Sequence, residues 1–276
     1  MKFLSKFYIG LIFLILYAPI LVVIVFSFNE SGSLSSFSGF SLYWYKELFR
    51  DGQALTALKN SLILAISSSL LATFIGTLAA FSIARAKSKR YQKLVEGVSN
   101  IPMMNPDIVT GVSMMLLFVG VATILGLSDS LGFWTMLLAH TTFNLPYVIL
   151  SVLPKFRQMD KNLTEAALDL GCTPAQTFFR VEVPCILPGV ISGFMMGFTL
   201  SLDDFVISHF VSSPDFKTLP LYIYNQTAHE VKFSMYALCT LMIVVILALL
   251  IAVNLAGSSD GSRRGRRHRR AKGVAK

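Results

Sequence analysis

The sequence predicts an all-α integral membrane protein that crosses the bilayer six times. The 276-residue chain is 54% hydrophobic and only 14% charged, whereas soluble domains carry about 25% charged residues. Its apolar residues gather in stretches that are almost free of charge and are near the length of about 20 residues that a helix needs to cross a bilayer. Lys and Arg are also shared unequally between the connections on the two sides of these stretches.

Six membrane-spanning segments are expected from the apolar stretches. They run over residues 7–28, 61–84, 98–125, 133–153, 185–209 and 233–256. The connections between them are too short to hold a separate soluble core. We therefore assign residues 1–256 to one transmembrane domain, and residues 257–276 to a basic tail that is expected to be disordered.

The positive charges predict the orientation of the chain, because Lys and Arg accumulate in cytoplasmic connections. With six spans, both termini lie on the same side of the membrane. The connections on that side hold 19 of the 24 Lys and Arg residues, and eight of these lie between Arg263 and Lys276. The N- and C-termini are therefore expected in the cytoplasm. The basic tail is assigned to contact with anionic membrane lipid rather than with nucleic acid.

The cytoplasmic connection over residues 155–184 carries the clearest local pattern. Asn162-Leu-Thr-Glu165 is a capping-box sequence, which predicts a short helix over residues 163–170. Gly171 follows it, at the position where a left-handed glycine often ends a helix. Thr173-Pro-Ala-Gln176 then resembles a second helix start. Two short helices with a sharp corner are expected, and a loop that merely connects two spans is the alternative.

The same connection resembles the EAA loop of ABC importer permeases. The matching residues are Glu165-Ala-Ala167, Gly171 after three intervening residues, and Val181-Glu-Val-Pro184 after a further nine residues, with Val183 where Leu is usual. The resemblance implies a MetI-like ABC importer permease fold. It also implies that the loop is a coupling helix inserted into an ATPase subunit. By this resemblance Glu165, Ala166, Ala167 and Gly171 are expected to form the core of that contact.

Shorter patterns narrow the resemblance to PotC-type permeases of spermidine and putrescine importers. They are Tyr17-Ala-Pro19-Ile, Ser27-Phe-Asn29, residues 102–109, residues 198–204 and Leu219-Pro-Leu221. The resemblance implies a multi-pass protein of a bacterial cytoplasmic membrane. The implied partners are a second, PotB-like permease subunit, two ATPase subunits and an extracytoplasmic solute-binding protein. ATP and Mg²⁺ are expected on the ATPase subunits, because this sequence has no Walker A motif.

Three carboxylates lie in or at the edge of the predicted spans, namely Asp107, Asp203 and Asp204. A charged side chain at the bilayer centre costs about 2.5–3.5 kcal/mol on insertion scales, so it is expected to face a protein interior or a water path. Asp107 lies nine residues into its span, roughly 13 Å at helical rise and hence near the midplane. Pro102 and Pro106 precede it, and the expectation there is a broken backbone that lines a cavity. The predicted spans contain no Lys or Arg, which suits a cationic solute. Tyr222 is the candidate for cation–π contact with an amine.

Each of these residues also has a structural alternative. A carboxylate can bond two helices together or cap a helix end, and Tyr222 can simply pack. His140, alone in the middle of a span, is expected to be a hydrogen-bonding partner between helices. No catalytic residue, bound cofactor or metal site is expected in this chain.

The sequence therefore predicts a permease subunit that passes polyamines inward and is not itself an enzyme. One alternative is an ABC permease for another small solute, such as thiamine or ferric ion. Another is a passive channel or a membrane scaffold that holds a cytoplasmic partner through its loop and tail.

Overall fold

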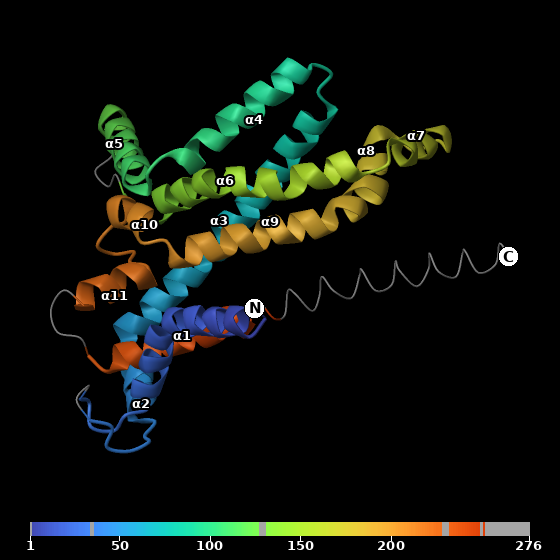
Figure 1. Cartoon of the computed structure of the whole chain (residues 1–276). Coiled ribbons are helices and arrows are strands. Elements are labelled where there is room, and N and C mark those ends of the chain that lie inside the picture. The colour runs from blue at the N-terminus through green and yellow to red at the C-terminus, as the bar shows by residue number, and fades with distance from the viewer. Residues whose placement is uncertain (1, 34–35, 127–130, 228–231, 249–250, 252–276) are drawn as a thin grey trace. The chain divides into compact units, whose positions relative to one another are not determined.

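The computed structural model describes residues 2–33, 36–126, 131–227, 232–248 and 251, and these residues are almost entirely helical (Figure 1). Within these ranges there is no β-strand, and only two isolated β-bridges occur. The all-α fold class is therefore confirmed. The tail expected over residues 257–276 and the end of the last predicted span lie outside the described residues.

The helices follow one another along the chain with short connections. They are α1 (Lys2–Phe26), α2 (Tyr43–Arg50), α3 (Gly52–Arg85), α4 (Lys89–Met104), α5 (Asp107–Leu125), α6 (Phe133–Gln158), α7 (Lys161–Asp169), α8 (Pro174–Thr177), the π-helical turn η1 (Phe178–Glu182), α9 (Val183–Asp203), α10 (Val206–Val211) and α11 (Leu219–Thr227).

Five stretches of the described chain are long and apolar enough to cross a membrane. They are Lys6–Phe26, Gly52–Arg85, Asp107–Leu125, Phe133–Gln158 and Pro174–Asp203. A shorter apolar helix, Ser234–Ala248, lies where the sixth span is expected.

Two of the predicted spans are interrupted. The segment expected over 98–125 is not one helix, because the backbone is extended at Asn105, with ψ 138°. Pro106 explains the break, since proline has no N–H and disfavours the helical conformation in the residue before it. The segment expected over 185–209 breaks at Asp204, with ψ 120°, between α9 and α10.

The chain forms two compact units. One holds the described residues of Met1–Leu55 and Asn225–Lys276, and the other is Thr56–Tyr224. In the first unit the buried side chain of Asn29 organises the connection after α1. It donates hydrogen bonds to the carbonyl oxygens of Ser33 at 2.7 Å and Ser36 at 2.9 Å. The indole of Trp44 in α2 donates to the carbonyl oxygen of Asn29 at 2.7 Å.

The second unit is built on α6 and α9, which run side by side (Figure 1). Their packing partner is α3, and the buried residues of the cluster are Ala72, Ala80, Ile83, Val148, Ile149, Val152, Leu153, Phe156 and Ile186. Gly189, Gly193 and Gly197 recur every four residues along α9 and are all buried. A Cβ added at Gly193 would lie 3.3 Å from Cα of Val148 in α6. These small residues let the two backbones approach closely, as in many membrane helix pairs.

Gly193→Leu is expected to lower the free energy of unfolding by about 1–3 kcal/mol, because an added side chain forces α9 away from α6. The measurement is an SDS unfolding titration of the purified protein in detergent micelles. Gly120→Leu in α5 is the matched control, since a Cβ there has no atom within 4 Å. Equal losses in the two variants would contradict the close approach at Gly193.

Candidate functional site

The connection between α6 and α9 forms a corner of two short helices, α7 and α8. We call residues 160–179 the α7–α8 corner. Asp160 caps α7, because its Oδ1 accepts a hydrogen bond from N–H of Asn162 at 3.0 Å. The expectation that Asn162 is the cap is therefore wrong, and α7 begins two residues earlier than predicted. Both residues have an oxygen suited to capping, and the structure uses the earlier one.

The end of α7 has the conformation that the sequence predicts. Gly171 has φ +84°, in the left-handed region. Its N–H donates to Leu168 O at 2.9 Å, and N–H of Cys172 donates to Ala167 O at 3.1 Å. This pair of bonds is a Schellman motif, which satisfies the last carbonyl groups of the helix. The chain direction therefore changes sharply at a defined residue.

The start of α8 is also as predicted. N–H of Gln176 donates to Thr173 Oγ1 at 3.3 Å, and N–H of Thr173 donates to Gln176 Oε1 at 3.0 Å. This is a complete capping box, with Pro174 at the start of the helix. The end of α7 and the start of α8 both have their backbone groups hydrogen-bonded. The α7–α8 corner is therefore an ordered element rather than a flexible linker.

The predicted contact residues of the α7–α8 corner do not all face outward. Glu165, Ala166 and Gly171 are exposed, whereas Ala167 is only 7% exposed and packs inside the protein. The α7–α8 corner also exposes four large apolar side chains that the prediction did not include, Leu163, Leu168, Leu170 and Phe179, and the last two are the most exposed, at 86% and 69%. Clustered apolar exposure marks interaction surfaces. The sequence did hold a signal for both residues, because Leu170 and Phe179 are large apolar side chains in an otherwise polar connection between two spans.

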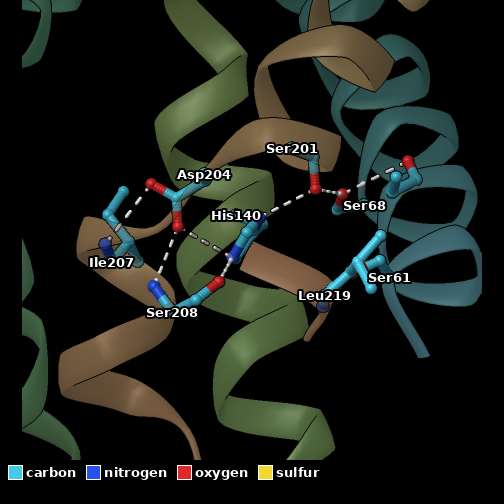
Figure 2. A network of polar contacts seen from close by, with 9 residues as sticks. Ser61, Ser68, His140, Ser201, Asp204, Ile207, Ser208 and Leu219 are labelled. Atoms are coloured by element: carbon cyan, nitrogen blue, oxygen red, sulfur yellow. Dashed lines mark hydrogen bonds and ion pairs between the residues drawn. The ribbon is translucent and has the colours of Figure 1, made fainter. Parts of the chain in front are cut away.

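A second polar feature lies among the apolar helices, where buried side chains join α3, α6, α9 and α10 (Figure 2). His140 of α6 is 1% exposed. Its Nδ1 is hydrogen-bonded to Ser201 Oγ of α9 at 2.7 Å, and its Nε2 to Ser208 Oγ of α10 at 3.2 Å. Ser201 is in turn bonded to Ser68 of α3 at 3.0 Å. The expected role of His140 as a hydrogen-bonding partner between helices is confirmed.

Asp204 completes this polar network and caps α10 (Figure 2). Its Oδ2 lies 3.5 Å from His140 Nε2 and accepts from N–H of Ser208 at 2.8 Å. Its Oδ1 accepts from N–H of Ile207 at 3.3 Å. Asp204 therefore has the capping and helix-bonding role that was the structural alternative to a solute contact. This role leaves its carboxylate largely enclosed, with 8% of the side chain exposed.

The other predicted pathway residues have different surroundings. Asp203 is the last residue of α9 and is exposed. Asp107 is exposed in the first turn of α5, where a negative charge complements the helix dipole. The backbone break expected near Pro102 and Pro106 is present, between α4 and α5. Tyr222 is only 6% exposed, whereas Tyr224 is 50% exposed and has its ring 4.7 Å from that of Phe205.

Comparison with known sequences identifies related transport proteins. Residues 72–256 match the family model described as binding-protein-dependent transport system inner membrane component. The chain is 38% identical to the spermidine/putrescine transport system permease protein PotC of Haemophilus influenzae, over 92% of this chain and 96% of that protein. It is also 38% identical to the putrescine transport system permease protein PotI of Escherichia coli strain K12, over 84% of this chain and 82% of that protein.

Solved structures show the same arrangement of helices. A chain of a bacterial ABC transporter involved in the import of the acidic polysaccharide alginate has a TM-score of 0.74 at 17% identity, covering 94% of this chain and 95% of that chain. The same kind of alginate transporter in complex with an alginate pentasaccharide-bound periplasmic protein has a TM-score of 0.72 at 18% identity, covering 92% of each chain. At 17–18% identity the similarity to these structures concerns the fold alone. It confirms the ABC permease fold that the connection over residues 155–184 predicts.

Asp204→Ala is expected to lower the free energy of unfolding by about 2 kcal/mol, because it removes the cap of α10 and leaves buried hydrogen-bonding groups without a partner. SDS unfolding of the purified protein measures the change. Asp203→Ala is the control, since it makes the same chemical change at the adjacent exposed residue, and it should stay within about 0.5 kcal/mol of the wild type. A larger loss for Asp203→Ala than for Asp204→Ala would contradict the capping role.

Proposed function

This chain belongs to the family of binding-protein-dependent transport system inner membrane components, and from this premise we propose that it is a permease subunit of an ATP-driven importer of polyamines. It is a multi-pass protein of the cytoplasmic membrane and a transport subunit rather than an enzyme. One observation carries the choice of solute. Relatives named for putrescine and spermidine transport are 38% identical to it over most of both chains.

The proposed orientation places both termini and the α7–α8 corner in the cytoplasm. The distribution of Lys and Arg supports it. In this orientation the exposed residues Glu165, Ala166, Leu170 and Gly171 face a cytoplasmic ATPase subunit. The capped, rigid corner suits the transfer of a movement from one subunit to another, because a flexible loop would absorb it.

The proposed assembly contains this chain, a second, PotB-like permease subunit, two ATPase subunits and an extracytoplasmic solute-binding protein. ATP and Mg²⁺ bind to the ATPase subunits, and their closure drives the change of access in the permease pair. The alginate transporter with its periplasmic protein supports this kind of assembly by analogy of fold.

The proposed solute path passes the carboxylates of the second unit. Asp107 and Asp203 are exposed and can attract an ammonium group, since a negative charge lowers the energy of a cation in a low-dielectric surrounding. Asp204 contributes mainly by fixing the start of α10 beside Asp203. Tyr222 is buried, so it shapes the wall behind the path, and the exposed ring of Tyr224 is the better candidate for cation–π contact.

Deletion of the gene is expected to abolish ATP-dependent uptake of radiolabelled putrescine or spermidine by intact cells, and a plasmid copy should restore it. Unlabelled putrescine and spermidine should compete for this uptake, whereas thiamine and ferric citrate should not. Uptake that survives deletion, or that thiamine or ferric ion suppresses, would contradict the proposed solute. A cell that lacks the permease but expresses the other subunits is the background for all variants below.

Gly171→Trp is expected to lower polyamine uptake by at least about tenfold, because a large side chain blocks docking of the ATPase at the α7–α8 corner. A tenfold loss corresponds to about 1.4 kcal/mol of binding free energy at the interface. Co-purification of the ATPase with the permease measures the docking directly. Gly126→Trp is the matched control. Gly126 also ends a helix, has φ +69°, and has open space around its Cβ position, so the backbone strain is similar at a place remote in sequence from the corner. Normal ATPase recovery with Gly171→Trp would refute docking there.

A further inference from the structure

A buried carboxylate lies where α3, α7 and the start of α9 meet. Glu182 is the last residue of η1, and its side chain is 1% exposed. Its Oε1 accepts a hydrogen bond from the guanidinium of Arg85, the last residue of α3. The same oxygen accepts from the hydroxyl of Thr164 in α7 at 3.2 Å. One carboxylate oxygen therefore joins η1 to α7, 18 residues earlier, and to the end of α3, 97 residues earlier.

Aromatic rings hold Arg85 in place for this contact. Its guanidinium carbon lies 4.5 Å from the ring centroid of Phe81, one turn earlier in α3. The ring of Phe81 lies 4.8 Å from that of Phe178, the first residue of η1, and 5.8 Å from that of Phe156 in α6. Because Phe178 and Glu182 belong to the same π-helical turn, Arg85 is held to η1 through both its charge and its aromatic neighbour.

The burial of Glu182 makes these contacts hard to break. Its second oxygen, Oε2, is buried and has no hydrogen-bond partner among the described residues. The negative charge therefore depends on Arg85 and Thr164 for its stabilisation, and loss of one partner leaves a poorly compensated charge in a low-dielectric site. A π-helical turn inside or beside an α-helix is itself common at functional positions.

We propose that Glu182, Arg85 and Thr164 form a latch that makes α7 and the Arg85 end of α3 move as one body. Glu182 is a positioning residue in this latch. Thr164 directly precedes Glu165 of the α7–α8 corner, so a displacement of the corner is transmitted through Glu182 to a membrane-crossing helix. The latch rests on the proposed function, because the force on the corner comes from the ATPase.

The first test measures polyamine imported per ATP hydrolysed by the complete importer in proteoliposomes. Arg85→Gln should lower this ratio by at least about fivefold, the low end of known coupling effects, while ATP hydrolysis continues. The matched control is Arg157→Gln. Arg157 forms an ion pair with Glu96 between α6 and α4, and its side chain is 50% exposed against 47% for Arg85. The control should stay within about twofold of the wild type. An unchanged ratio in Arg85→Gln, or an equal fall in the control, would overturn the proposal.

A paired variant separates the latch from simple packing. Arg85→Met with Glu182→Met removes both charges and leaves no unpaired buried charge, so folding and assembly are expected to be kept. The latch predicts an assembled complex that hydrolyses ATP but imports poorly. Full recovery of import in this double variant would show that Arg85 and Glu182 serve packing alone.

A second readout does not depend on the solute. Spin labels at Asn162→Cys, at the exposed start of α7, and at Ser82→Cys in α3 report the distance between the two elements. The native Cys172, Cys185 and Cys239 are replaced by Ser, and no label then lies beside Gly171. In the assembled complex this distance should stay the same when ATP and vanadate are added, and it should change or broaden with Arg85→Gln. A change already present with Arg85 intact, or no change with Arg85→Gln, would overturn the latch. A wild-type complex that imports no polyamine would refute the proposed solute, while the distance measurement still decides the latch.

Discussion

Close contact between α6 and α9 is possible only because three glycines of α9 face α6, and the second unit is arranged around this contact. Inside a bilayer, lipid tails are as apolar as leucine side chains, so burial alone does not drive two helices together. Van der Waals contact and hydrogen bonds must hold them. At Gly189 the carbonyl oxygen of Ser151 lies 2.9 Å from where a Cβ would be, so the helices are as close there as their backbones allow. The remaining helices of the unit pack around this pair.

Interactions within a few residues of the chain were predictable. Gly171 and the Thr173–Gln176 box were identified because a helix cap joins neighbours in the sequence, and the residue types alone indicate it. The cap of α7 was wrongly assigned to Asn162, because Asp160, two residues earlier, has an oxygen equally suited to capping. The break before α5 had a local signal too, in Asn105-Pro106. Hydropathy alone draws one span over residues 98–125, because the chain is apolar on both sides of the break, and the prolines are what indicate it.

Contacts between distant residues were not predictable in this way. Asp204 was recognised as a carboxylate near a helix end, but its neighbour His140 comes from a different helix. Arg85 and Glu182 are 97 residues apart, and in the sequence each is one charged residue beside a membrane segment. The family pattern named Ala167 as a contact residue, yet its side chain faces inward. A sequence motif shows which residue types occur at which spacing. It does not show which face of a short helix packs against the rest of the protein.

Two polar contacts join α3 to the segment from η1 through α9, and they give the latch a route into the membrane. Ser68 and Arg85 are 17 residues apart in α3, and Glu182 and Ser201 are 19 residues apart from the end of η1 through α9, which is about 25–29 Å of helix in each case. Arg85 is bonded to Glu182 at one end, and Ser68 to Ser201 at the other. The two segments therefore run in opposite directions between these contacts and are joined at two places, one of them the end of α3 and the other the middle of α3. Because Ser201 also holds His140, a displacement that enters at Glu182 reaches the residues that position Asp204 and the start of α10. The proposed latch and the proposed solute path are therefore connected through α3 and α9, with no flexible segment between the latch and the path.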